Sequence, residues 1–325
     1  MRMSLVIPVW NDPEGLVRLL SQVCDMTCFT EIIVYDDASQ RPCGPDMPGL
    51  LPAVAIDPRL VWLRGTTQMG AGHARNRALD KVTGSHVLFF DSDDLFLPPF
   101  GDLVSQMEPE ETPFDFCLFC HVDSRTRAHG GLGPLPADDR IWTAAQIGTA
   151  PRPLEREDMI RFSRIDAYPW NKIYRTAFLR ENAIRCTEIP VHNDIELHWM
   201  SFLRARRILA SSLLCCEHFV IESGTRLTNR NDKDRFEVFQ ALDHIQAELL
   251  RNPRLTDYAE PFNEFCARLF AWISTGLEPG LQAEFAGLAR DFVRDRVPEP
   301  LFALLALQNP ALADRFLRLM KGTGR

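Results

Sequence analysis

The sequence predicts an α/β protein with a mostly parallel central sheet, followed by an α-helical extension. Apolar runs of strand length alternate with helical patterns over the first hundred residues, as is typical of strand–helix–strand units. After about Asn231, apolar residues recur at helical spacing to the end of the chain. Because 325 residues exceed one ordinary domain, we expect a sheet domain over residues 1–228 and a helical subdomain over residues 229–325.

The first part of the sheet domain contains short β-rich runs separated by helical patterns. The expected strands are Met3–Val9, Glu31–Tyr35, Leu60–Leu63 and His86–Phe90. The expected helices are Pro13–Cys24 and Ala71–Lys81. Ligands of parallel sheets bind at the carboxyl ends of the strands, and the unusual polar clusters of this chain follow these strands directly.

The second part of the sheet domain is less regular. The apolar run Phe114–Val122 should place alternate residues in a core, whereas Asp123–Pro153 is rich in glycine and proline and is expected to be a long loop. Helical patterns follow at Glu155–Ser163, Lys172–Glu181 and Asn193–Arg206, and a strand is expected at Ile208–Ile221.

Composition excludes several classes of function. A formal charge of −8 and a pI of about 5.5 argue against broad nucleic-acid binding, which depends on Lys and Arg. No apolar stretch approaches the length of a membrane span, and Met1–Val9 lacks the features of a signal peptide, so a soluble protein is expected. Cys117 and Cys120 lie in an apolar run, which favours buried thiols in a reducing cytoplasm over a zinc or redox pair.

The strongest chemical signal is the acidic cluster Asp91-Ser92-Asp93-Asp94, directly after a predicted strand. Three carboxylates in four positions repel one another unless a positive charge neutralises them. Mg²⁺ and Mn²⁺ prefer such oxygen ligands and often bind carboxylates together with substrate phosphates. The cluster therefore indicates a metal that holds a diphosphate, and the alternative is a solvated acidic turn.

Two further clusters are weaker on their own. Asp36 and Asp37 follow another strand, where they could accept hydrogen bonds from a ribose or a base, or simply begin a turn. The stretch from Gly70 to Asn76 opens a helix whose N-terminal N–H groups could face a phosphate, with Arg75 one turn in. A glycine-rich helix start is also common for purely structural reasons.

Together these clusters resemble the family 2 glycosyltransferases, which are inverting enzymes of the nucleotide-sugar-binding GT-A fold. The matching segments, in the order and spacing of that family, are Ile7-Pro8-Val9-Trp10-Asn11, Asp36-Asp37-Ala38-Ser39, Ala74-Arg75-Asn76 and Asp91-Ser92-Asp93-Asp94. The resemblance implies a nucleotide-binding half over residues 1–105 and an acceptor-side half over residues 106–228.

The resemblance also assigns roles to single residues. It implies that Pro8, Val9 and Trp10 line the base pocket and that Asp36 and Asp37 hold the base or the ribose. The other residues expected to contact the nucleotide donor are Asn11, Arg75, Asp91 and Ser92. Asp93 would ligate the metal, with Asp91 at the ribose or in the metal's water shell, and Asp94 would face the sugar or acceptor.

A second region of resemblance lies further along the chain, at Pro169–Arg175, His192-Asn193-Asp194 and Ser223-Gly224-Thr225. In the family, the second carboxylate of an acidic pair that opens a helix is the catalytic base, and this position is Asp194 here. Asn193 stands where the family usually has Glu, which leaves the base itself in place but changes the contacts that would support it. The alternative is that Asn193 and Glu196 form a helix-capping arrangement and that Asp194 only favours the helix dipole.

Five side chains of the second half are further candidates for the site. Trp170, Lys172 and Asn193 could contact the sugar or the acceptor, although Trp170 could equally be a core aromatic and Lys172 a solvated residue. His218 could complete the metal shell or remain structural, and Arg226 could bind the diphosphate.

The resemblance implies transfer of a sugar from a nucleotide-diphosphate donor, favouring UDP, to a glycan or glycoconjugate such as a surface polysaccharide, with Mg²⁺ or Mn²⁺. One alternative is a non-catalytic nucleotide-sugar-binding protein on the same scaffold. A nucleotidyltransferase would normally have a glycine-rich basic loop after its first strand, and an NAD enzyme would have G-x-G-x-x-G there. The helical tail could bind an acceptor, pair with a second subunit, or rest on the inner face of the membrane.

Overall fold

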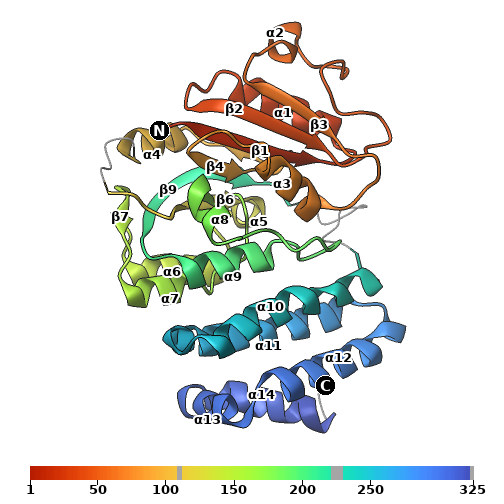
Figure 1. Ribbon diagram of the computed structural model, residues 1–325, viewed down its shortest axis with the longest axis vertical. Coiled ribbons are helices and arrows are strands. Elements are labelled where there is room, and N and C mark those ends of the chain that lie inside the picture. The colour runs from red at the N-terminus through yellow and green to blue at the C-terminus, as the bar shows by residue number, and fades with distance from the viewer. Residues whose placement is uncertain (108–111, 221–229, 323–325) are drawn as a thin grey trace.

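The computed structural model describes residues 1–107, 112–220 and 230–322, and its central element is a nine-stranded mixed sheet with helices on both faces (Figure 1). The strand order is β3-β2-β1-β4-β8-β6-β9-β5, and β7 pairs with β9. The strands are β1 (Met3–Val9), β2 (Phe29–Asp36), β3 (Leu60–Arg64), β4 (His86–Phe89), β5 (Leu95–Phe96), β6 (Phe116–Asp123), β7 (Arg152–Pro153), β8 (Lys172–Arg175) and β9 (Ile208–His218).

The parallel part of the sheet determines where a site can form. β1 pairs in parallel with both β2 and β4, and β2 pairs in parallel with β3. β8 is antiparallel to β4 and β6 and therefore marks the change from one half of the sheet to the other. The carboxyl ends of β1, β2 and β4 consequently lie at one edge, as the sequence predicts.

Each face of the sheet is covered because successive strand residues point to opposite sides. Leu5 and Ile7 pack in a core with α1 (Pro13–Val23) and α4 (Pro99–Met107). Val6 faces the other core, which includes α3 (Ala71–Leu79), α8 (Thr176–Glu181) and α9 (Ile195–Arg204). The remaining helices of this region are α2 (Pro52–Ala55), α5 (Ser124–Ala128), α6 (Pro136–Ala145) and α7 (Arg156–Phe162).

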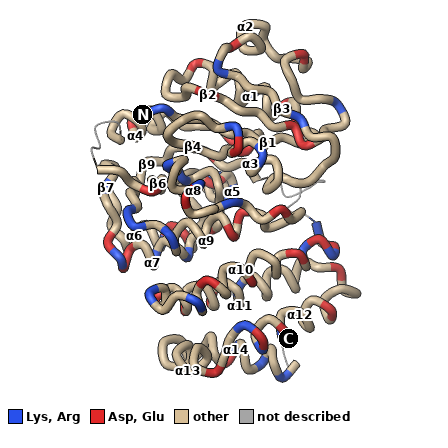
Figure 2. The backbone as a smooth tube through the Cα atoms, viewed as in Figure 1, with Lys and Arg blue, Asp and Glu red and all other residues tan. Residues whose placement is uncertain are grey.

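The C-terminal region is helical, as expected, and packs on the sheet domain through α9 (Figure 1). Trp199 of α9 is fully buried against Phe262, with ring centroids 5.1 Å apart. Acidic and basic residues are interspersed along these helices (Figure 2). The elements are η2 (Lys233–Glu237), α10 (Val238–Arg251), η3 (Pro253–Tyr258), α11 (Ala259–Gly276), α12 (Pro279–Arg296), α13 (Glu299–Gln308) and α14 (Pro310–Lys321). Among the described helices, none has both the length and the apolar character to cross a bilayer.

Three expectations about elements are wrong in part. The expected loop Asp123–Pro153 contains α5 and α6, because Pro136 opens a helix whose Trp142 and Ala145 are buried. The expected helix Lys172–Glu181 begins as β8, because Lys172–Arg175 pairs with two neighbouring strands before α8 starts. The expected strand Ile208–Ile221 ends at His218, and Ile221 lies outside the described residues.

Candidate active site

The loops after β1 and β2 are tied together at the carboxyl edge of the sheet. The N–H of Asp37 donates to the carbonyl of Val9 at 2.9 Å. The backbone N–H of Asn11 donates to Oγ of Ser39 at 2.8 Å, and the N–H of Gln40 donates to Oδ1 of Asn11 at 2.8 Å. Of the three residues expected at the base pocket, Pro8 and Val9 are buried and Trp10 is half-buried, whereas Asn11 beside them is exposed.

The carboxylates of Asp36 and Asp37 are both buried and both organise loops. Asp36 accepts from the N–H groups of Ser39 at 2.8 Å and Cys43 at 3.0 Å, and it is ion-paired with Arg64. Asp37 accepts from the backbone N–H groups of residues 69 and 70, the closer at 2.6 Å, and burial raises its pKa. Their contact with a ribose or a base stays a prediction.

The acidic cluster after β4 comes together as predicted. Carboxylate oxygens of Asp91, Asp93 and Asp94 lie within 4.8 Å of one another, which is a donor set that suits a hard divalent cation. Asp94 is fully buried and receives hydrogen bonds from Nδ1 of His218 at 3.0 Å and from the N–H of Phe219 at 2.9 Å. Burial raises the pKa of Asp94, and the Asp94 carboxylate raises the pKa of His218 against the opposing effect of burial.

Ser92 lies within this cluster but faces the loop after β1. Its hydroxyl donates to Oδ2 of Asp12 at 2.8 Å, while Oδ1 of Asp12 caps the start of α1 through the N–H of Gly15. Asp12 was not among the predicted site residues, although an Asp before the helix-opening Pro13 is a recognisable capping signal. The role of Ser92 in binding a nucleotide stays a prediction.

Arg75 connects the acidic cluster to the helix α9. Its side chain is 5% exposed, and its two terminal nitrogens donate to Asp91 at 2.6 Å and to Oδ1 of Asn193 at 2.8 Å. Attraction to the Asp91 carboxylate raises the pKa of Arg75 despite burial, so this guanidinium is permanently charged. Because Asn193 precedes Asp194, one cation links the proposed metal ligands to the proposed base.

Asp194 is the N-cap residue of α9, but its side chain makes no capping hydrogen bond. Oδ1 of Asn193 is occupied by Arg75, and Glu196 is bonded to Thr187 instead, so the capping arrangement considered from the sequence does not form. Burial raises the pKa of Asp194 to about 6, and the neighbouring charge of Arg75 opposes this effect. A carboxylate of this kind is ionised at neutral pH yet basic enough to accept a proton.

Trp170 lies in a core, as one of its two interpretations predicted, whereas Lys172 is buried in a strand and is not the solvated residue considered from the sequence. Trp170 is buried, stacks on Tyr168 at 4.4 Å between ring centroids, and lies 4.9 Å from the ring of His218. Lys172 is fully buried and donates to the carbonyl of Tyr168 at 2.7 Å and to Oδ1 of Asn171 at 2.6 Å. Burial lowers the pKa of Lys172 to about 7. Contact of either residue with a sugar stays a prediction.

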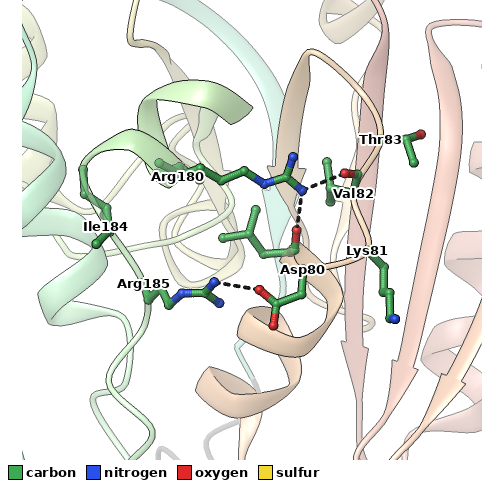
Figure 3. Close-up of a pocket in the computed structure, with 10 residues that line it drawn as sticks. Asp80, Lys81, Val82, Thr83, Arg180, Ile184 and Arg185 are labelled. Carbon is green, nitrogen blue, oxygen red and sulfur yellow. Dashed lines mark hydrogen bonds and ion pairs between the residues drawn. The ribbon is translucent and has the colours of Figure 1, made fainter.

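Arg226 and the segment Ser223-Gly224-Thr225 lie outside the described residues. A cavity of about 500 Å³ lies elsewhere, between the end of α3 and α8 (Figure 3). Its arginines are engaged locally, because Arg180 donates to the carbonyls of Leu79 and Val82 and Arg185 pairs with Asp80. No predicted site residue lines this cavity.

Comparison with solved structures confirms the fold. The chain superimposes on residues 1–349 of TarS from S. aureus in complex with UDP-GlcNAc, with a TM-score of 0.73 at 21% identity over 99% of this chain and 91% of that one. A mannosyltransferase from Pyrobaculum calidifontis in complex with GDP-Man and Mn²⁺ gives a TM-score of 0.54 at 17% identity, over 98% and 85% of the two chains. The GT-A sheet and the helical C-terminal region are thus shared with TarS.

Sequence comparisons agree. EpsH of Bacillus subtilis, named as a glycosyltransferase, is 23% identical over 270 residues, which cover 81% of this chain and 73% of EpsH. YwdF of the same organism, also named as a glycosyltransferase, is 26% identical over 210 residues, or 64% and 69% of the two chains. The model of the family described as "Glycosyl transferase family 2" matches residues 4–179, more than half of the chain. The protein therefore belongs to glycosyl transferase family 2.

Proposed function

We propose that this glycosyltransferase moves a sugar from a UDP-linked donor to a hydroxyl group of a glycan or glycoconjugate, with inversion at the anomeric carbon. The main support is the bridge made by Arg75 between Asp91 and Asn193. This bridge fixes the acidic cluster, where a diphosphate would leave, relative to Asp194, where an acceptor hydroxyl would be deprotonated. The similarity to TarS, which was crystallised with UDP-GlcNAc, supports the choice of UDP.

On the side of the leaving group, Asp93 and Asp91 would hold Mg²⁺ or Mn²⁺, and Asp94 lies close enough to them to add a third hard oxygen ligand. When bound, such an ion supplies positive charge that stabilises the departing diphosphate. Arg75 would contribute a second positive charge on the same side. Because its guanidinium is buried, its attraction for a diphosphate would be screened less than in water.

On the side of the acceptor, Asp194 would accept the proton of the attacking hydroxyl. With a pKa of about 6, it is ionised at pH 7 to 8 and close to the range in which a general base works best. The hydroxyl oxygen then forms the new bond to the anomeric carbon while the bond to the diphosphate breaks. Because attack and departure occur on opposite faces of the sugar, the configuration inverts.

The second candidate is a nucleotide-sugar-binding protein without transferase activity, and the observation that favours it is Asn193 in place of the usual Glu. Donor hydrolysis by water distinguishes the two candidates, since a non-catalytic protein should not cleave any nucleotide sugar. We also propose a cytoplasmic location, because the nine cysteines are all free and most are buried.

A thermal-shift panel of nucleotide sugars, with and without Mn²⁺, tests the proposal first, because a ligand raises the apparent stability of the state it binds. The donor that raises Tm most is then incubated with the enzyme and the products are analysed. Release of nucleoside diphosphate supports transfer, whereas release of pyrophosphate would indicate a nucleotidyltransferase. Full activity in excess chelator would remove the metal from the proposal.

A further inference from the structure

Helix α11 of the C-terminal region lies antiparallel to α9, the helix that follows the proposed base. Near the start of α11, the rings of Phe262 and Phe265 lie 5.1 Å and 5.5 Å from the ring of Trp199 in α9. Near its end, the ring of Trp272 lies 5.6 Å from the ring of His192, which precedes α9. The end of α11 is therefore brought to the end of α9 at which Asp194 lies.

Trp272 is unusual because it is a large aromatic residue left 53% exposed beside this site. It continues, at spacings of four and three residues, a stripe of Phe265 and Leu269, which are partly buried against the core that α9 shares with the C-terminal helices. The guanidinium carbon of Arg235 lies 4.4 Å from the centroid of the Trp272 ring, so a fixed cation holds the indole. An indole held in this way offers a large, rigid apolar face with a polar edge, which suits contact with a ligand that is partly apolar and partly hydrated.

The contacts of Trp272 also fix it relative to the base. His192 adopts a φ of +65°, an uncommon conformation for a residue other than glycine, and Nη1 of Arg235 donates to its Nε2 at 3.3 Å. Burial and the charge of Arg235 lower the pKa of His192 to about 3, so the imidazole is neutral and accepts this hydrogen bond. Asp194 is only two residues further along the chain.

We infer that Trp272 forms an acceptor subsite contributed by the C-terminal helical region, on which a sugar ring of the acceptor stacks. This inference rests on the proposed function, since it identifies which substrate approaches Asp194 from this side. Within the segment His192-Asn193-Asp194, Arg75 contacts Asn193 and belongs to the side of the diphosphate, whereas Trp272 contacts His192. The C–H groups on one face of a pyranose pack against an indole as an apolar surface, and its hydroxyl groups remain in water.

The decisive experiment compares Trp272→Ala with Trp272→Phe. The probes are methyl glycosides, disaccharides and trisaccharides of glucose, galactose, mannose and N-acetylglucosamine, and their binding is measured by saturation-transfer NMR without turnover. We expect Trp272→Ala to weaken binding of the best probe, or to raise its acceptor KM, by about tenfold, and Trp272→Phe to restore most of the loss. The value of kcat at saturating acceptor should change much less.

Leu307→Ala is the matched control, because Leu307 is a more exposed apolar residue of the same helical region, on α13. It should leave acceptor binding and Tm unchanged. If Trp272 only supported the loop of His192, Trp272→Ala would lower kcat and weaken UDP binding measured by calorimetry, and that result would overturn the inference. It would also be overturned if Trp272→Ala bound every probe as wild type does, or if wild type bound none.

The proposed function can fail separately from this inference. If no nucleotide sugar is bound or cleaved by wild type, yet saccharide binding is lost in Trp272→Ala and restored in Trp272→Phe, the subsite stands as a carbohydrate site and the transferase proposal is wrong. If wild type transfers sugar but its acceptor KM does not depend on residue 272, the transferase proposal stands and the subsite is wrong.

Discussion

Replacement of Asp194 by Asn should remove sugar transfer and, at the same time, stabilise the protein at neutral pH. Burial raises the pKa of Asp194 from its ordinary value of 3.8 to about 6, so its ionisation opposes folding. A tenfold change in an ionisation constant corresponds to about 1.4 kcal/mol, which gives a gain of up to about 3 kcal/mol for a neutral residue of the same shape. Asn has the same shape as Asp, and its side chain stays uncharged over the whole pH range of the test.

The gain should depend on pH in a defined way. Below pH 3.8 the carboxyl is protonated in both the folded and the unfolded chain, so Asp and Asn should give similar stability. Between pH 3.8 and about 6 the unfolded chain ionises first, and the wild type loses stability relative to the variant. At pH 5 about half of the difference should be present, and above pH 7 it should be constant. Urea unfolding at pH 5 and pH 8 measures both points.

Measurements of sugar transfer and of UDP binding by the Asp194→Asn variant complete this test. The variant should lose at least about 100-fold in kcat, the contribution expected of a general base, and should still bind UDP. Glu196→Gln is the matched control, because Glu196 lies in the first turn of the same helix and accepts a hydrogen bond from Thr187. Removing that charge should not raise stability. A variant of Asp194 that is no more stable than wild type at pH 8, or that keeps near-normal transfer, would refute the reasoning.

Other changes give equally specific expectations. Asp93→Asn or excess EDTA should abolish the rise in Tm caused by a UDP-sugar, and Mn²⁺ should restore it only in the chelated wild type. Asn193→Glu should place a second carboxylate next to Asp194 and raise the pKa of the base, which would move the acidic limb of the pH–rate profile upward by up to about one pH unit. Gly72→Ala would place a Cβ 2.5 Å from a backbone carbonyl oxygen, so it should cost about 1–3 kcal/mol in urea unfolding. Gly101→Ala, where the structure offers open space in α4, is its control and should not destabilise.

Local sequence was sufficient to predict the strands of the parallel half of the sheet. Runs such as Met3–Val9 are apolar on both sides because both faces of the sheet are covered, and their length distinguishes them from helices. It was insufficient at Lys172–Arg175, where pairing with β4 and β6 decides the conformation of a segment that also fits a helix. Long-range pairing overrides local propensity there.

The site was predictable to a similar extent. Polar clusters directly after β2 and β4 were expected at one edge of the sheet, since both strands are parallel to β1, which lies between them. The link from Arg75 to Asn193 could not be read from the chain, because 118 residues separate the two side chains. The approach of Trp272 to His192 depends on how α11 packs against α9, and a helical pattern alone does not specify that packing.

The presence of Asn at position 193, where the family usually has Glu, is compatible with the proposed role of Asp194 as general base. Asn193 keeps a hydrogen bond of 2.8 Å to Arg75, so the start of α9 remains attached to the acidic cluster. A Glu at this position would add negative charge beside Arg75 and Asp194, whereas Asn leaves more of the guanidinium charge to oppose the rise in the pKa of Asp194. We therefore expect Asn193 to shift the pH range of the proposed base, Asp194, rather than to abolish its function.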